Sequence, residues 1–189
     1  MRISVFGLGY VGCVNIACFS KLGHKLIGVD VDTNKVNKLN KNLPTVSEPQ
    51  LEEFLSQYKE NYYATTSAQE AIENSDIAIL CINTPNNKEG NLDTSILEKC
   101  VKDISTYLLN KKDFFVIMIK STVNPGTCEK LSKKVERLTG KVADKDFSIV
   151  SIPEFLREGS AVKDFFNPPY TLVGSNYLKL KPIIKKMNE

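Results

Sequence analysis

The sequence predicts an α/β fold, in which a doubly wound, mostly parallel sheet carries helices on both faces. Three observations predict it. Short apolar runs alternate with amphipathic stretches along the 189 residues, several of these runs are apolar throughout, and the first one leads directly into the glycine-rich segment FGLGYVG. Continuously apolar runs suit strands that are buried on both sides, as in parallel sheets. We therefore expect a succession of βαβ units.

The expected strands are short and rich in β-branched or aromatic residues. Two of them, DIAILCI and FFVIMIK, are apolar almost without interruption. Each expected strand is bounded by turn residues or by a helical pattern. The strands cover residues 2–6, 24–29, 62–65, 76–82, 114–120, 147–152 and 170–173.

The expected helices carry apolar residues three and four positions apart. The first ends at Gly23, the second is capped by Asp32 and has Leu43 on its apolar face, and the fifth is capped by Asp93. Their ranges are 11–22, 32–42, 51–58, 68–74, 93–109 and 127–138. A last amphipathic segment, interrupted by Pro182, has an apolar side that needs a partner, formed by Tyr177, Leu180, Ile184 and Met187.

The glycines Gly7, Gly9 and Gly12 have the spacing G-x-G-x-x-G between the first strand and the first helix. Glycines in this pattern allow a tight turn, close approach of a pyrophosphate and close packing of the helix, whose N-terminus faces the phosphates. Asp30 ends the second strand, where an acid binds the ribose hydroxyls and repels the 2′-phosphate of NADP. These observations predict NAD as the cofactor. The alternative is a structural βαβ unit without a ligand.

Polar or otherwise distinctive segments follow five of the expected strands. Besides the glycines and Asp30, they are Thr84-Pro85, Ser121-Thr122 and Pro153-Glu154. Ligands of open α/β sheets bind outside the carboxyl ends of the strands. We therefore expect these five loops to converge on one edge of the sheet.

The composition is that of an ordinary globular protein, with 42% hydrophobic and 25% charged residues and a net charge of +3. No apolar run reaches the roughly 18 residues of a membrane span, and no signal-peptide pattern is present, so we expect a cytoplasmic protein without membrane contact. The lysine-rich stretches are interleaved with acids at helical spacing, which favours a solvated face over nucleic-acid binding. Five scattered cysteines indicate reduced, mostly buried thiols and neither disulfides nor a metal site.

Several motifs occur together in one order: FGLGYVG, the acid at Asp30, NTP at Thr84, STV-x-PGT from Ser121, and PEFLREGSA from Pro153. Together they resemble the UDP-glucose/GDP-mannose 6-dehydrogenase family, specifically its N-terminal NAD-binding domain, which has a Rossmann-type fold. The resemblance covers nearly the whole chain. It implies an NAD-binding domain over residues 1–175 and, in 176–189, the start of a connecting helix toward domains absent from this chain. The segment NPPYTLVG is more similar to the GDP-mannose branch.

The resemblance implies an NAD-dependent, four-electron oxidation of UDP-glucose or GDP-mannose at the sugar C6 alcohol, through a cysteine thioester, to the uronic acid. It also implies that the full-length enzyme is a homodimer. Glu154 and Thr122 would be catalytic, and Phe155, Leu156, Arg157 and Glu158 would join Glu154 in binding the sugar nucleotide. The cofactor would contact the glycines, Tyr10, Val11, Asp30, Lys35, Thr84, Thr122 and Glu158. Read without the resemblance, Thr122 is equally well a helix cap and Glu154 a solvated loop acid.

Two departures from the family pattern matter. Ile152 stands where the family usually has Asn before Pro-Glu, and none of the five cysteines lies in the glycine-rich segment that carries the family's nucleophile. Cys81 and Cys128, at a strand end and a helix start, are better explained as packing residues. We expect the isolated chain to be inactive. A stand-alone NAD-binding module without catalysis is the alternative, whereas a 3-hydroxyacid dehydrogenase would not explain PEFLREG.

Overall fold

Six parallel strands form a single sheet in a computed structural model that describes residues 1–175 and 177–189. The strands are β1 (Arg2–Phe6), β2 (Lys25–Val29), β3 (Tyr62–Thr65), β4 (Ile77–Leu80), β5 (Phe115–Ile119) and β6 (Phe147–Ser151), and their order is β3-β2-β1-β4-β5-β6. The chain moves outward from β1 to β3 and then returns to add β4, β5 and β6 on the other side. This order confirms the predicted doubly wound sheet.

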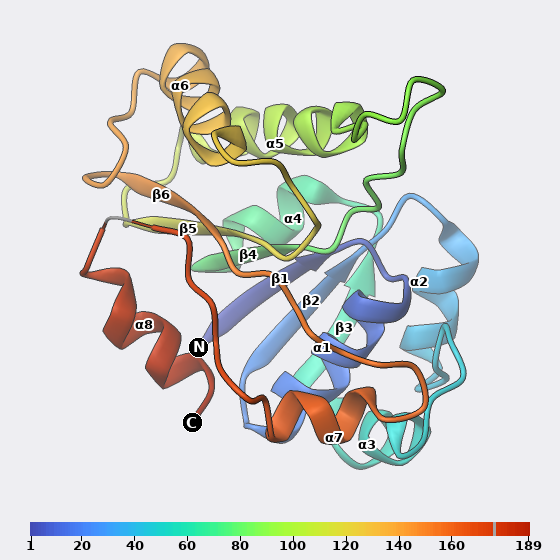
Figure 1. Cartoon of the computed structure of the whole chain (residues 1–189). Coiled ribbons are helices and arrows are strands. Elements are labelled where there is room, and N and C mark those ends of the chain that lie inside the picture. The colour runs from blue at the N-terminus through green and yellow to red at the C-terminus, as the bar shows by residue number, and fades with distance from the viewer. Residues whose placement is uncertain (176) are drawn as a thin grey trace.

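Helices cover both faces of the sheet (Figure 1). One face carries α1 (Tyr10–Lys21), α2 (Thr33–Asn40), α3 (Leu51–Gln57), α7 (Ala161–Phe166) and α8 (Leu180–Met187), with a short 3-10 turn at Lys59–Asn61. The other face carries α4 (Ala68–Glu73), α5 (Ser95–Leu108) and α6 (Thr127–Thr139). No helix in these described residues is both long and apolar enough to cross a membrane.

A hydrophobic core lies on each face of the sheet. Each strand contributes side chains to both cores, because successive side chains of a strand point to opposite faces. In β1, Ile3 and Val5 pack with α1, whereas Phe6 packs on the face of α4 and α5. The continuously apolar runs of β4 and β5 are buried throughout, as predicted for central parallel strands. Helix α1 is buried over most of its length because it lies between the sheet, α3 and α7.

The prediction of a last strand over residues 170–173 is wrong. This stretch is not a strand, and only the following Gly174 forms an isolated antiparallel bridge with Ser151. Pro168 and Pro169 precede it and offer no N–H groups for pairing, and Leu172 is 51% exposed, so the stretch lacks the buried face of a strand. One smaller expectation also fails, because Leu43 is exposed. Thr94 precedes the first residue of α5 but makes no side-chain capping bond, whereas the Asp93 carboxylate accepts the Ser95 N–H at 2.8 Å and caps the helix as predicted.

Helix α8 confirms the expected amphipathic segment, apart from Asn176, which lies outside the described residues. Its buried residues Leu180, Ile184 and Met187 join the same core as α1, so the apolar side finds its partner within this domain. Pro182 lies in the first turn, where a helix needs no N–H from it. The division of the chain at residue 175 stays a prediction.

Candidate functional site

The residues singled out by the sequence lie mostly in loops that follow the strands of one sheet edge. Because all six strands are parallel, their carboxyl ends share that edge. The chain leaves β1 toward β2 on one side and reaches β4 on the other, so the switch point of the fold lies between β1 and β4. Ligands of such sheets bind at this point.

The three glycines of the loop between β1 and α1 differ in their structural surroundings. Gly7 has φ +91°, and a side-chain carbon there would lie 2.6 Å from the Cys81 carbonyl oxygen. A side-chain carbon at Gly12 would lie 1.8 Å from the Gly7 carbonyl oxygen, which forbids any residue but glycine. At Gly9, in contrast, no atom lies within 4 Å of that position. The loop therefore presents open backbone at Gly9, where α1 begins.

Asp30 lies at the end of β2 and holds this loop. Its carboxylate, only 8% exposed, accepts hydrogen bonds from the Leu8 N–H at 2.7 Å and from the Asp32 N–H at 2.9 Å, and it pairs with Lys35 at 3.3 Å. A carboxylate has about four acceptor positions. One position is thus left for a ligand hydroxyl beside the glycine loop.

A cleft of about 520 Å³ runs along the sheet edge from Lys35 to Glu154. Thr84 and Thr122 lie side by side in its wall, since the Thr84 hydroxyl donates to the Thr122 carbonyl oxygen at 2.8 Å. The Ser121 hydroxyl donates to the Ile82 carbonyl oxygen and fixes the same two loops. The cleft is lined by Gly9, Tyr10, Val11, Lys35, Cys81, Ile82, Asn83, Thr84, Lys120, Ser121, Thr122 and Glu154.

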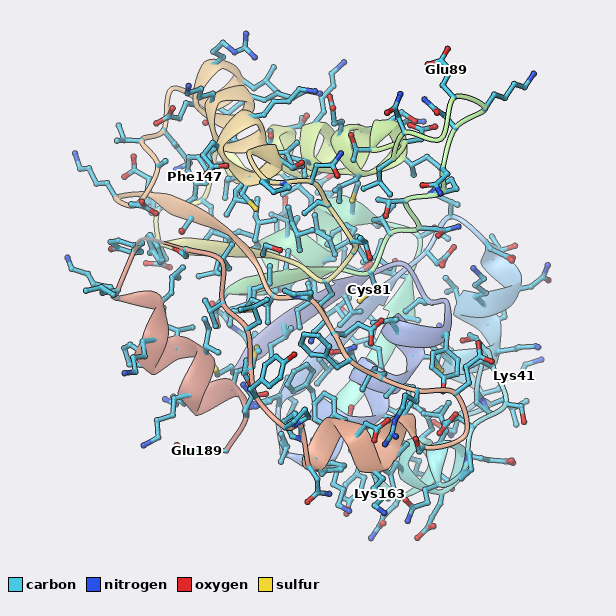
Figure 2. All side chains as sticks on the ribbon, viewed as in Figure 1. Lys41, Cys81, Glu89, Phe147, Lys163 and Glu189 are labelled. Carbon is cyan, nitrogen blue, oxygen red and sulfur yellow. The ribbon has the colours of Figure 1, made fainter. Side chains whose placement is uncertain are left out.

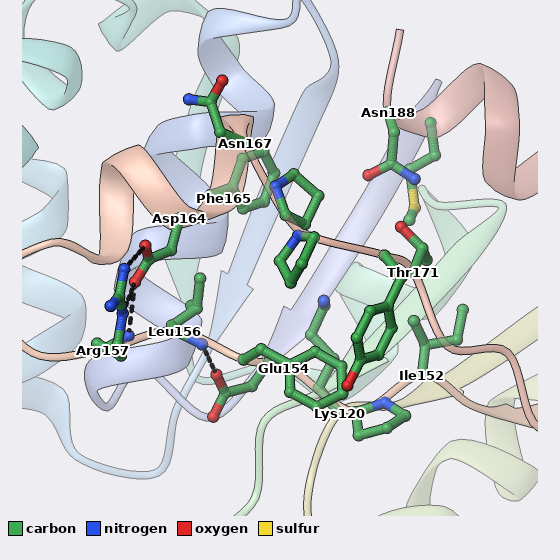
Figure 3. A pocket seen from close by; sticks show the side chains of 16 residues that line it. Lys120, Ile152, Glu154, Leu156, Arg157, Asp164, Phe165, Asn167, Thr171 and Asn188 are labelled. Atoms are coloured by element: carbon green, nitrogen blue, oxygen red, sulfur yellow. Dashed lines mark hydrogen bonds and ion pairs between the residues drawn. The ribbon is translucent and has the colours of Figure 1, made fainter.

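A second hollow, of about 370 Å³, opens beside the cleft beneath the loop that follows β6 (Figure 3). Phe155 and Tyr170 stack edge to face with ring centroids 5.0 Å apart and leave both rings partly exposed. Lys120 and Glu154 line both hollows. The aromatic hollow and the cleft thus adjoin each other at these two residues.

The loop after β6 carries the predicted substrate residues, and the structure holds them in different ways. The Glu154 carboxylate accepts the Leu156 N–H at 2.5 Å, and Leu156 packs against the core. The Arg157 guanidinium forms a two-pronged ion pair with Asp164 at 2.7 and 3.0 Å and holds the pKa of that carboxyl well below its usual range. Arg157 is therefore already paired.

Glu158 is a predicted cofactor residue that does not line the cleft, and neither do Gly7, Gly12 and Asp30, which lie in or hold the glycine loop beside it. The Glu158 side chain is exposed. Its charge acts on the Tyr10 hydroxyl instead. Its role in cofactor binding stays a prediction.

Glu48 is a site residue that the sequence did not reveal. It precedes α3, is buried, and accepts hydrogen bonds from the Tyr10 hydroxyl, from the Gly159 N–H at 2.8 Å and from the Ala161 N–H at 2.8 Å. Burial alone would raise the pKa of the Glu48 carboxyl, but these hydrogen bonds outweigh it and lower the pKa. Glu48 thus ties the start of α1 to the start of α7.

The two cysteines near the site are poor nucleophiles. Cys81 follows β4 (Figure 2) and is half-buried in the wall of the cleft, and burial raises the pKa of its thiol to about 12. Burial likewise raises the pKa of Cys128, in the first turn of α6, to about 11. Since only the thiolate is nucleophilic, both cysteines behave as packing residues at neutral pH.

The comparison with known proteins fits this geometry. The model of the UDP-glucose/GDP-mannose dehydrogenase family, NAD binding domain, matches residues 1–189. The chain belongs to this family. GDP-mannose 6-dehydrogenase of Pseudomonas aeruginosa is 39% identical over 177 residues, which are 92% of this chain and 41% of that protein. The chain thus spans about two fifths of the length of this curated relative.

Solved structures of dehydrogenases of this family superpose on nearly the whole chain and are themselves covered to less than half. A ternary complex of GDP-mannose dehydrogenase from Pseudomonas aeruginosa superposes with a TM-score of 0.95 at 36% identity, covering 99% of this chain and 44% of that one. UDP-glucose dehydrogenase from Pyrobaculum islandicum superposes with a TM-score of 0.90 at 34% identity, covering 98% and 43%. The match confirms the resemblance and the Rossmann-type fold that the sequence predicted.

NAD fits the residues present. The open backbone at Gly9 meets the N-terminus of α1, as pyrophosphate binding requires, and Asp30 keeps an acceptor position for a ribose hydroxyl. A carboxylate at this point disfavours a 2′-phosphate. The chain is accordingly an NAD-binding domain, as predicted.

Proposed function

We propose that this domain is the cofactor-binding part of a nucleotide-sugar 6-dehydrogenase, which oxidises the C6 alcohol of a nucleotide sugar to a carboxylate while two NAD are reduced. One observation carries the proposal: a cleft suited to NAD adjoins, at Lys120 and Glu154, a second hollow with exposed aromatic rings. A dehydrogenase needs such a junction, because hydride passes between cofactor and substrate only at short range.

The bound NAD would supply the hydride acceptor, and the chain would supply its orientation. Asp30 and Lys35 would hold the adenosine ribose, and the backbone of Tyr10 and Val11 would face the pyrophosphate. Thr84 and Thr122 would line the nicotinamide half of the cofactor. Glu154 would stand at the junction as the acid–base residue. Phe155 and Tyr170 offer the flat apolar surfaces on which a sugar ring stacks.

We further propose that the 189-residue chain binds NAD but does not turn substrate over. The family's chemistry passes through a cysteine thioester, and burial raises the pKa of both cysteines near the cleft far above neutrality. The domain would thus supply half of an active site and require a partner segment that brings the nucleophile.

The test combines a binding and a turnover measurement. Calorimetry of the purified chain should show NAD binding and weaker or no NADP binding. Absorbance at the NADH band should stay flat with NAD and either GDP-mannose or UDP-glucose. GDP-mannose is the first substrate to test, because the GDP-mannose 6-dehydrogenase of Pseudomonas aeruginosa is 39% identical to the chain. NADH production by the chain alone would overturn its dependence on a partner segment, and absence of NAD binding would overturn the proposed function.

A further inference from the structure

Lys120 occupies the junction between the two hollows. It follows β5 directly, is half-buried, and lines the aromatic hollow together with Glu154 (Figure 3). The same two residues also line the cleft. Within the described residues, its ammonium group has no hydrogen-bond or ion-pair partner. Moving an unpaired ammonium group partly out of water costs free energy, unless a ligand or a nearby opposite charge compensates for it.

The fold determines which half of the cofactor reaches Lys120. Asp30, at the end of β2, holds one ribose, and Gly9, at the end of β1, faces the pyrophosphate. The dinucleotide must then continue in the opposite direction from β2, past β4 to β5 and β6, because the cleft extends there to Glu154. On the proposed function, the nicotinamide half therefore ends beside Lys120.

The charges at this end of the cleft are few. Cys81 and Glu154 are the groups whose charge acts on Lys120. The Cys81 thiol is protonated at neutral pH, since burial raises its pKa. Burial lowers the pKa of Lys120, and Glu154 opposes that change. Lys120 and Glu154 thus form a loose pair of opposite charges around the nicotinamide end.

We propose that Lys120 sets the preference of this domain for the reduced over the oxidised cofactor. The oxidised nicotinamide ring carries one positive charge and the reduced ring carries none, so a fixed ammonium repels only the oxidised form. When an alcohol carbon gives its hydride, one proton with two electrons, to the ring and the hydroxyl proton is released, an aldehyde and NADH form. Because only the oxidised ring is charged, Lys120 would favour this direction of the reaction.

The test measures the dissociation constants of NAD and NADH for the purified chain by calorimetry and by NADH fluorescence. The ratio compared is the dissociation constant of NAD divided by that of NADH. Lys120→Met should tighten NAD relative to NADH and so lower this ratio about three- to tenfold. Lys120→Arg, which keeps the charge, should leave the ratio within about twofold of the parent. Glu154→Gln, which removes the opposite charge, should raise the ratio.

Lys35→Met is the matched control, because it removes a lysine charge from the far end of the same cleft. It should weaken NAD and NADH equally, since both carry the same adenosine half. An unchanged ratio in Lys120→Met, or an equal change in Lys35→Met, overturns the inference while leaving the proposed function intact. If the parent chain binds neither cofactor, the proposed function fails and the inference fails with it.

Discussion

The Asp30 carboxylate accepts the Leu8 N–H at 2.7 Å, so the acid at the end of β2 holds the glycine loop that follows β1. The same carboxylate caps the Asp32 N–H and pairs with Lys35. An acid that would bind a ribose is therefore also a structural part of the loop that would bind the pyrophosphate. Changes at Asp30 should affect both.

We expect Asp30→Asn to lower NAD affinity at least about tenfold without creating NADP affinity, because an amide no longer satisfies every donor in the loop. The free energy of unfolding should fall by about 1–3 kcal/mol. Calorimetry with both cofactors and urea denaturation measure the two effects. Asp32→Ala is the control: it removes the α2 cap at a cost of about 1 kcal/mol but should leave NAD affinity within about twofold. NADP binding by Asp30→Asn would contradict this prediction.

The glycines offer a second pair of matched variants. Gly9→Ala should fold with a loss of at most about 1 kcal/mol, because its new methyl group meets open space, yet NAD affinity should fall at least about tenfold as that group fills the pyrophosphate position. Gly12→Ala should lose at least about 3 kcal/mol or fail to fold, because its methyl group would overlap the Gly7 carbonyl oxygen. Circular dichroism during urea titration and calorimetry separate the two outcomes. Equal loss of stability in both variants would show that Gly9 has no ligand-specific role.

Sequence patterns predicted the fold and the local part of the site, and missed what depends on distant neighbours. The glycine loop and Asp30 lie within 30 residues of each other, and their spacing is set by one βαβ unit. Glu48 binds the Gly159 N–H across 111 residues, and no local pattern encodes that contact. Lys120 carried a weak signal as the charged end of an apolar strand. The strand expected at 170–173 failed because strand propensity says nothing about a pairing partner.

Glu48→Ala should lower the free energy of unfolding by about 2–4 kcal/mol, because the Gly159 and Ala161 N–H groups lose a charged acceptor. The loop after β6 should loosen, and trypsin should then cut faster after Arg157. Urea denaturation and timed proteolysis measure these changes. Tyr10→Phe is the control, since it removes one hydroxyl from the same cluster and should cost about 1 kcal/mol without faster cleavage.

The contribution of Glu48 to the free energy of unfolding should also depend on pH. Because the folded pKa lies below the ordinary value of 4.5, the stabilisation is complete above pH 4.5 and is lost as the pH falls through the folded pKa. Glu48→Gln should flatten that part of the curve of unfolding free energy against pH. A curve in Glu48→Gln as steep as that of the parent chain would show that Glu48 does not anchor the loop.

His24 joins the two ends of the domain, because its Nδ1 lies 3.2 Å from the Met1 amino group and its Nε2 lies 2.8 Å from the Met187 carbonyl oxygen of α8. Burial lowers the pKa of His24 below its ordinary value of 6.5, and the nearby amino group adds to the effect. The folded state then binds fewer protons than the unfolded state, so stability is complete above pH 6.5 and declines as the pH falls below it. Urea denaturation at pH 7.5 and 5.5 measures this decline, and His24 is the single histidine of the sequence.

His24→Gln should remove that decline while costing less than about 1 kcal/mol at pH 7.5, because the amide can still donate to the Met187 carbonyl oxygen. Amide hydrogen exchange should locate the change in α8, where Leu180, Ile184 and Met187 attach the helix to the core. In the parent chain, α8 should exchange faster at pH 5.5, after correction for the intrinsic rate, than at pH 7.5. Uniform exchange along the chain, or an unchanged decline in His24→Gln, would place the pH sensitivity elsewhere than at the contact between His24 and α8.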